Sequence, residues 1–168
     1  RMSRRKGFSL VELLIVLAVI AALIATITPV ALNAIRKAQA TKVAQNIKTL
    51  ASAIENAAYV NGIDNSDFIK KSTSGDLTIT IADLGRDIDS DNYGVWYRHE
   101  GEGRFKVSVF TKESVDFTTS KGVLGDLTTT KPSDYIKGTT PTNPTKLGFA
   151  TNTDDDVKFG YNFEFIVY

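Results

Sequence analysis

The chain contains 168 residues, 42% of them hydrophobic and 23% charged, and its formal net charge at pH 7 is +1. This length accommodates one globular domain together with an extended segment. The chain has no cysteine, which excludes disulfides, thiolate metal sites and thiol nucleophiles. Four positive charges lie in the first seven residues, and removing them takes the side-chain sum from +1 to −3. That balance gives no general electrostatic basis for nucleic-acid binding.

A basic segment followed by a long apolar run opens the chain. The run, residues 8–27, contains twenty residues and a single charge, that of Glu12; the basic residues before it are Arg1, Arg4, Arg5 and Lys6. A helix of about twenty residues spans roughly 30 Å, the thickness of the hydrocarbon core of a bilayer. The basic flank predicts that the N-terminal end stays in the cytoplasm. A carboxylate costs about 2.5–3.5 kcal/mol near the bilayer centre and less near the interface, so Glu12 is expected to have a partner.

The stretch Lys6-Gly7-Phe8-Ser9-Leu10-Val11-Glu12-Leu13-Leu14 resembles the processing site of type IV prepilins and of the related pseudopilins. The resemblance implies that a prepilin peptidase cleaves between Gly7 and Phe8 and methylates Phe8 at its new N-terminus. It also implies that Glu12 pairs with the N-terminal ammonium of a neighbouring subunit. The implied partners are further copies of the chain in a helical homopolymer, the prepilin peptidase, the pilus or secretion assembly machinery of the inner membrane, and the membrane itself before assembly.

An ordinary secretory signal or an uncleaved anchor is the alternative for this segment, since both have a basic region followed by an apolar one. The nearest small-x-small cleavage pattern, Ala38-Gln39-Ala40, lies more than ten residues past the end of the run. An acid within the apolar region is also unusual for a simple signal.

Beyond Ile27 the apolar pattern becomes one-sided. Apolar residues recur at spacings of four, three and four, which predicts an amphipathic helix packed on a globular domain; they are Val43, Ile47, Leu50 and Ile54. Asn61-Gly62 is a plausible helix end, because glycine accepts the left-handed conformation. The sequence therefore predicts one helix of about fifty residues from Phe8, near 80 Å in length if straight.

Pro29 lies inside this predicted helix. Proline removes one backbone hydrogen bond and clashes with the carbonyl four residues before it, so a kink is expected there. In related pilins, a proline at the equivalent position marks a bend at which the helix can unwind in the filament. A bend where the helix leaves the membrane is an alternative, compatible role.

The remaining chain predicts a small antiparallel sheet. We expect a loop at 72–76, a short extended segment at 77–81, strands at 95–99 and 104–110 joined by a turn at 100–103, a long exposed connection at 120–153, and a final strand with an aromatic face at 157–167. The predicted fold is α+β, the pilin fold: a long N-terminal helix kinked near Pro29, with its C-terminal half packed on three or four strands. The predicted segments are a cleaved leader at 1–7, a transmembrane and filament-core helix at 8–33, and a globular pilin domain at 34–168, divided into an amphipathic helix at 34–61 and sheet and loops at 62–168.

Two acidic clusters are candidate calcium sites. Asp87, Asp89 and Asp91 have the alternate spacing of calcium loops, although Asn92 replaces the expected glycine and Arg98 the expected glutamate at the twelfth position. The second cluster precedes the final strand and comprises Asp154, Asp155 and Asp156, with Asn152 nearby. Some pseudopilins bind calcium near their C-terminal loops. The alternative is that both clusters are solvated acidic turns that bind no metal ion. We expect no cofactor other than calcium.

No enzymatic motif is present in the sequence. His99 is the single histidine, and a catalytic histidine would need an oriented nucleophile and a third group that no motif supplies. We therefore expect a non-enzyme.

The resemblance implies a structural subunit of a type IV pilus-like filament, active in adhesion, motility or DNA uptake. It would lie in the inner membrane as a precursor and then in a periplasmic or extracellular filament. A pseudopilin of a type II secretion system is the alternative: the lack of cysteine and the calcium candidates favour it, whereas Pro29 and the 120–153 connection favour a surface pilin. A membrane-anchored binding module that never polymerises would instead keep its leader.

Overall fold

The computed structural model describes residues 7–73, 75–137, 143–149 and 153–168, so the basic residues of the expected leader and Asn152 lie outside the described residues. Its elements in order are α1 (Leu10–Asn61), β1 (Lys70–Ser72), β2 (Gly75–Thr78), α2 (Ile81–Leu84), β3 (Tyr93–His99), β4 (Arg104–Thr111), α3 (Phe117–Val123), β5 (Leu127–Thr128), α4 (Pro132–Tyr135), β6 (Thr145–Gly148) and β7 (Phe159–Ile166). The chain forms two compact units, Arg1–Ala38 and Gln39–Tyr168.

Helix α1 has the extent that the sequence predicts. It comprises 52 residues and remains helical through Pro29. At its end Gly62 adopts a φ of +73°, and its N–H donates to the carbonyl of Ala58 at 3.2 Å. This left-handed glycine caps the helix, as expected from Asn61-Gly62. The kink at Pro29 stays a prediction.

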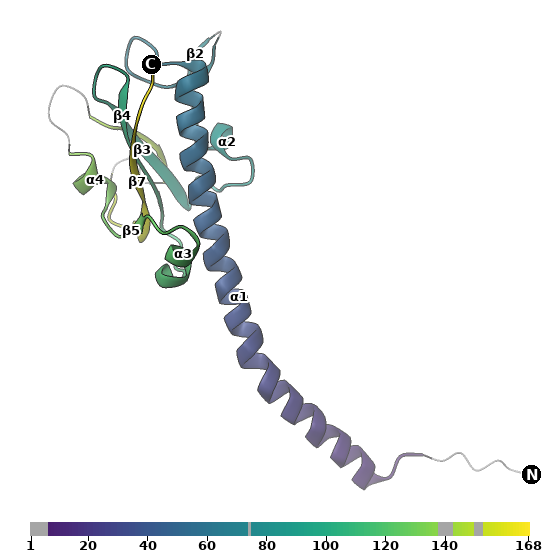
Figure 1. The fold of residues 1–168 in the computed structure, drawn as a ribbon. Coiled ribbons are helices and arrows are strands. Elements are labelled where there is room, and N and C mark those ends of the chain that lie inside the picture. The colour runs from purple at the N-terminus through teal and green to yellow at the C-terminus, as the bar shows by residue number, and fades with distance from the viewer. Residues whose placement is uncertain (1–6, 74, 138–142, 150–152) are drawn as a thin grey trace, which may run out of the picture. The chain divides into compact units, whose positions relative to one another are not determined.

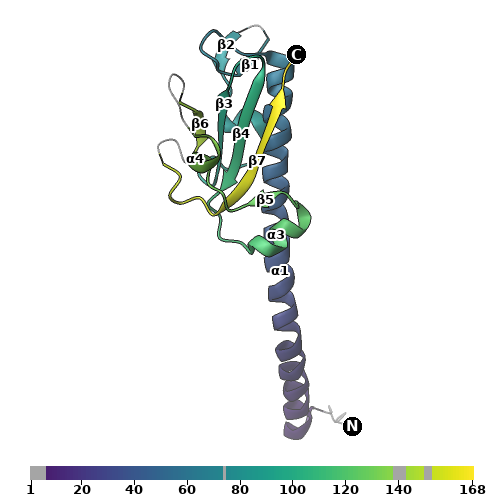
Figure 2. The same ribbon diagram turned by 60° about the vertical axis from the view of Figure 1, so that its left-hand side comes forward.

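The main sheet is antiparallel, with strand order β5-β7-β4-β3-β6 (Figures 1 and 2). The hairpin of β3 and β4 confirms the predicted pair of strands; in its turn Gly101, Glu102 and Gly103 all have positive φ. The sheet has five strands rather than the three or four expected, because the short β5 and β6 add to its two edges.

The C-terminal half of α1 covers one face of this sheet (Figures 1 and 2). The apolar positions predicted from the helical spacing are fully buried there, including Ile47, Leu50 and Ile54. Alternate residues of β3, β4 and β7 meet them, such as Tyr97, which pairs with Val107 in the sheet. A single core therefore fixes α1 to the sheet within the unit Gln39–Tyr168.

A second, smaller core lies on the opposite face of the sheet. Trp96 and Phe110 project there and pack with Ile136 and Val157, both of which come from the segments around α4 and before β7. The rings of Trp96 and Phe110 meet edge to face at 6.1 Å. The sheet is thus covered on both faces.

The predicted loop at 72–76 and extended segment at 77–81 are wrong in detail. Ser72 ends β1 and Gly75 begins β2, so this region is a tight two-stranded hairpin. Ile81 begins α2 instead of continuing a strand, because Thr80 and Asp83 form a capping box around the first turn: the backbone N–H of Thr80 donates to the carboxylate of Asp83 at 2.9 Å.

The expectation of one long exposed connection at 120–153 is also wrong. Part of α3, and all of β5, α4 and β6, lie in this stretch, and Ser120, Leu127 and Ile136 are buried. The Ser120 hydroxyl donates to the carbonyl of Ala40 in α1 at 2.9 Å. These elements are too short for their apolar residues to show a period, and they are held by contacts with segments distant in the sequence.

Candidate functional site

The residues around the predicted cleavage site form the start of α1. Gly7, Phe8 and Ser9 precede the first helical residue, and the Phe8 side chain is 85% exposed. The backbone N–H of Ser9 donates to the carboxylate of Glu12 at 3.0 Å, and the backbone N–H of Glu12 donates to the Ser9 hydroxyl oxygen at 3.2 Å. This reciprocal pair is a capping box, which satisfies two of the N–H groups that a helix leaves unpaired at its start.

The capping box gives Glu12 a local role that our reading of the sequence missed. The signal is the Ser-x-x-Glu spacing of Ser9 and Glu12, which is visible in the sequence. Its bonds hold the carboxylate beside the backbone of Ser9, one residue from Phe8. Cleavage after Gly7 would therefore create the new ammonium next to this carboxylate.

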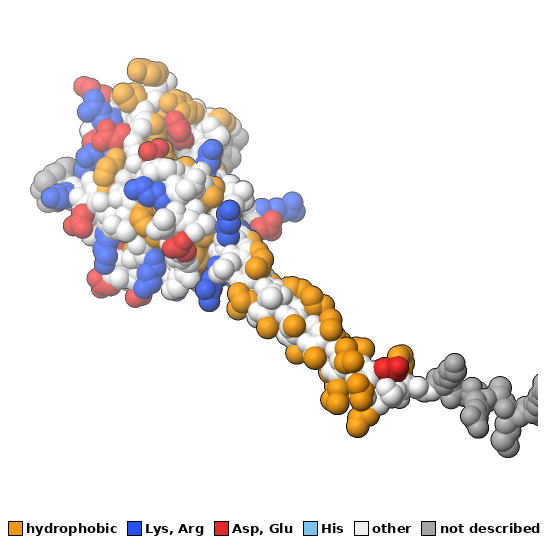
Figure 3. Space-filling view, turned by 60° about the horizontal axis from the view of Figure 1, so that its bottom comes forward, with side chains coloured by type: hydrophobic (Ala, Val, Ile, Leu, Met, Phe, Trp, Pro, Cys, Tyr) orange, Lys and Arg blue, Asp and Glu red, His pale blue; other side chains and the backbone are white. Residues whose placement is uncertain are grey.

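The large apolar side chains of α1 between Leu10 and Ile35 are exposed within their unit. Figure 3 shows hydrophobic side chains covering this part of the helix on the face in view. By length and composition α1 can cross a membrane, and the described residues bury none of its most apolar stretch. An apolar surface of this extent is not stable in water, which is consistent with a membrane-anchored precursor.

Two threonine hydroxyls donate hydrogen bonds to backbone carbonyls in the turn before Pro29. Thr26 donates to the carbonyl of Leu23 at 2.9 Å, and Thr28 donates to that of Ile24 at 2.7 Å. Such bonds satisfy the hydroxyls inside an apolar environment and tend to bend helices. Pro29 and these threonines lie in the same turn, so the predicted kink is expected there.

The first acidic cluster is built as a turn. One Asp89 oxygen accepts from the backbone N–H of Asp91 at 2.9 Å, and the other accepts from the side-chain amide of Asn92 at 3.0 Å. Asp87 and Asp91 are exposed. The hydrogen bonds of Asp89 shape the entry to β3 and do not require a cation.

The second cluster also has a structural use. Asp154 is buried, and its carboxylate accepts from the backbone N–H of Ser133 at 2.9 Å, whereas Asp155 and Asp156 are exposed. Within the described ranges, no group of three or more histidine and acidic side chains is placed to hold a metal ion. The calcium candidates are therefore not gathered into a site in this structure.

Burial opposes ionisation of Asp154, but the hydrogen bonds from Ser133 outweigh it and lower the pKa of Asp154. A lowered folded-state pKa means that the ionised carboxylate stabilises the fold above its ordinary pKa of about 3.9, and that this stabilisation disappears as the pH falls through the lower value. We expect the melting temperature of detergent-solubilised protein to fall more steeply below about pH 4 in the wild type than in Asp154→Asn. Asp156→Asn, at an exposed position, is the control and should follow the wild type. Equal slopes in all three proteins would contradict this assignment.

Calcium at roughly 1–5 mM is expected to leave the melting temperature of the same protein unchanged, although weak extracellular calcium sites bind with dissociation constants of about 0.1–1 mM. The reason is that the carboxylates of Asp89 and Asp154 already accept hydrogen bonds from protein groups. Magnesium at equal concentration controls for ionic strength. A rise specific to calcium, removed by Asp87→Asn or Asp155→Asn, would establish a site at the corresponding cluster.

His99 has a structural environment. Its Nδ1 lies 2.8 Å from an Asp67 carboxylate oxygen, its Nε2 accepts from the backbone N–H of Gly103 at 3.2 Å, and its ring lies 4.9 Å from that of Phe105. Both ring nitrogens therefore have partners, one in the β3–β4 turn and the other in the segment between α1 and β1.

Comparison with known proteins identifies the N-terminal segment. A family model, the prokaryotic N-terminal methylation motif, matches residues 2–28, which contain the predicted cleavage site and the whole apolar run. No curated protein and no solved structure matched the chain significantly. The α+β arrangement of α1 on the five-stranded sheet matches the pilin fold. The chain carries the class III signal of type IV pilins and pseudopilins, a class of structural subunits, and this motif indicates a pilin-like or pseudopilin precursor.

Proposed function

We propose that the chain is a structural subunit of a type IV pilus-like filament, which is cleaved after Gly7 and polymerises through its N-terminal helix. The observation that carries the proposal is the continuity of α1: one helix joins the methylation motif and its exposed apolar surface to the buried positions of the globular unit. An N-terminal helix of this kind provides a membrane anchor before assembly and a contact surface afterwards.

Filament formation requires more than apolar contact. Lipid tails solvate an apolar helix as well as another apolar helix does, so association in the membrane depends on close packing and on polar pairs. In this proposal the Phe8 ammonium of an incoming subunit pairs with Glu12 of its neighbour. A subunit docked out of register would leave a charge buried without a partner, which is strongly disfavoured. The pair therefore sets the register as well as the affinity.

The proposal divides the chain by role. Residues 1–7 are the leader removed by the prepilin peptidase, residues 8–33 form the filament core, and residues 34–168 form the pilin domain. The basic leader keeps the N-terminus in the cytoplasm, so the globular domain of the precursor faces the periplasm. In the filament this domain forms the outer surface, which serves adhesion, motility or DNA uptake.

A pseudopilin of a type II secretion system is the second candidate. It is favoured by the absence of cysteine, since many type IV pilins close a C-terminal loop with a disulfide. The two candidates differ in where the polymer ends: a pilus extends from the cell, and a pseudopilus stays in the periplasm.

Labelling of intact cells with antibodies raised against residues 63–168 separates the candidates. Extended labelled fibres, recovered in the sheared fraction, are the result expected for a pilus. Labelling that requires permeabilised cells, with cross-linked oligomers in the periplasm, would favour the pseudopilus. A uniformly monomeric, membrane-bound chain in cells that hold the assembly machinery would contradict both.

A further inference from the structure

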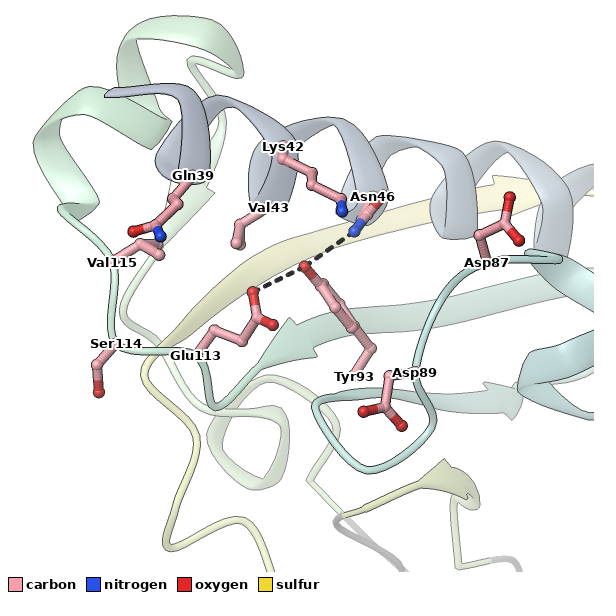
Figure 4. Close-up of a pocket in the computed structure, with 10 residues that line it drawn as sticks. All are labelled: Gln39, Lys42, Val43, Asn46, Asp87, Asp89, Tyr93, Glu113, Ser114 and Val115. Atoms are coloured by element: carbon pink, nitrogen blue, oxygen red, sulfur yellow. Dashed lines mark hydrogen bonds between the residues drawn. The ribbon is translucent and has the colours of Figure 1, made fainter. Parts of the chain in front are cut away.

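A groove lies along the globular unit, between the start of its helix and two loops (Figure 4). One wall is the face of α1 that carries Gln39, Lys42 and Asn46; the other is formed by the loop before β3 and by the segment after β4. The cavity has a volume of about 460 Å³, which accommodates a long side chain.

A hydrogen-bonded tyrosine fixes the floor of this groove. The Tyr93 hydroxyl accepts from the Asn46 side-chain amide at 3.1 Å and donates to a Glu113 oxygen at 3.2 Å (Figure 4). Burial, assisted by the nearby Glu113 carboxylate, raises the pKa of Tyr93, so the hydroxyl stays protonated and keeps donating. The other Glu113 oxygen accepts no hydrogen bond within the described part of the chain, which leaves it available to a donor from outside.

The lining of the groove has excess negative charge. Asp87, Asp89 and Glu113 contribute three carboxylates and Lys42 one ammonium, and none of the three acids is in an ion pair with another described residue. An exposed carboxylate is well solvated alone, but a groove that holds several of them favours a cationic occupant with several donors.

The register of the proposed filament supplies such an occupant. If the Phe8 ammonium of one copy pairs with Glu12 of another, the two parallel helices are offset by about four residues, or ~6 Å. Identical helices follow the same path, so this offset is kept along their length. Arg36 of the first copy then comes level with residue 40 of the second, beside Gln39 at the entrance of the groove.

Arg36 has the properties that the groove requires. It is exposed, and its planar guanidinium carries five donors that suit carboxylate oxygens. We propose that the groove between α1, the loop before β3 and the segment after β4 receives Arg36 of a second copy of this chain. This interaction rests on the proposed filament and adds a second register contact, near the globular domain, to the one at Glu12.

The absence of native cysteines makes cross-linking a clean test. Two differently tagged full-length chains, one with Arg36→Cys and one with Ser114→Cys, are co-expressed in cells that assemble the filament. Ser114 lines the groove and is exposed, so this near-isosteric change leaves the fold intact. Oxidation is expected to give a heterodimer that carries both tags. Arg36→Cys paired with Ser66→Cys, an exposed serine outside the groove, is the matched control.

Charge reversal tests the energetics independently. Arg36→Glu places a fourth carboxylate against the three in the groove, and we expect it to reduce filament yield by on the order of ten-fold or more. Glu113→Lys in the same chain, at the end of the groove nearest Gln39 (Figure 4), should restore most of the yield. Lys48→Glu, on an exposed part of α1 outside the groove, should change it little.

The two levels of the hypothesis fail differently. If the unmodified chain forms no filament, the proposed function and the groove contact both fall. If filaments form but the Ser114 pair cross-links no better than the Ser66 pair, or if Arg36→Glu assembles normally, only the groove contact is overturned. A heterodimer that is lost in Glu12→Ala supports both.

Discussion

Replacing Glu12 with alanine is expected to leave the precursor inserted in the membrane and to abolish filament assembly. Insertion should persist because removing a carboxylate from the apolar run lowers its cost in the bilayer. Assembly should fail because the N-terminal ammonium of each incoming subunit would be buried without its partner, at a cost of roughly 3–5 kcal/mol per contact. Immunoblots of the membrane and sheared fractions measure the two outcomes separately.

The capping box makes the control for this variant important. Glu12 also accepts a hydrogen bond from the backbone of Ser9, so alanine removes a helix cap together with a charge. Glutamine can still accept that bond but carries no charge. Glu12→Gln should therefore fail to assemble, like the alanine variant, if charge pairing drives the process. Ser9→Ala removes only the reciprocal hydroxyl contact, worth about 1 kcal/mol, and should assemble at a reduced yield. A normal filament yield from Glu12→Gln would contradict the hypothesis that Glu12 pairs with the N-terminal ammonium of a neighbouring subunit.

Ile47→Ala is expected to cause a large loss of folding stability, as a truncation of any fully buried core residue of α1 would. The Ile47 side chain is fully buried between the helix and the sheet, in the same core as Tyr97 and Val107. Truncation leaves a cavity that the surrounding strands cannot fill, which typically costs about 2–5 kcal/mol. For a domain of this size the melting temperature should fall by roughly 4–20 °C.

Thermal unfolding of the detergent-solubilised full chain, followed by circular dichroism in the near ultraviolet, measures this effect. Lys48→Ala, at the adjacent exposed position, is the matched control and should change the melting temperature by little. A melting temperature for Ile47→Ala within a degree or so of that of the control would show that α1 does not share a core with the sheet.

The long helix and the central strands could be predicted because their patterns are long. The spacing from Val43 to Ile54 covers three helical turns, and the alternation along β7 extends over eight residues. In contrast, β5 has two residues and α4 has four, which is shorter than any period that reports secondary structure. Their positions depend on tertiary contacts, such as the packing of Ile136 against Trp96.

Of the candidate sites, those within one short stretch of sequence could also be predicted, and those assembled from distant segments could not. Gly7, Phe8 and Glu12 lie within six consecutive residues, so their order and spacing alone indicate the processing motif. The groove near Glu113 combines three segments that are far apart in the sequence, and only the fold brings them together. The alternate spacing of Asp87, Asp89 and Asp91 is that of a calcium loop, but it does not reveal the hydrogen bonds by which Asp89 shapes this turn.

The most direct test is the intact mass and N-terminal sequence of the protein purified from its native membrane. Cleavage by the prepilin peptidase predicts a chain that begins at Phe8 and carries one additional methyl group. An N-terminus at Arg1 or Met2, or a cleavage near Ala25 or Ala40, would contradict the proposal that this chain is processed as a prepilin and assembled through Phe8 and Glu12.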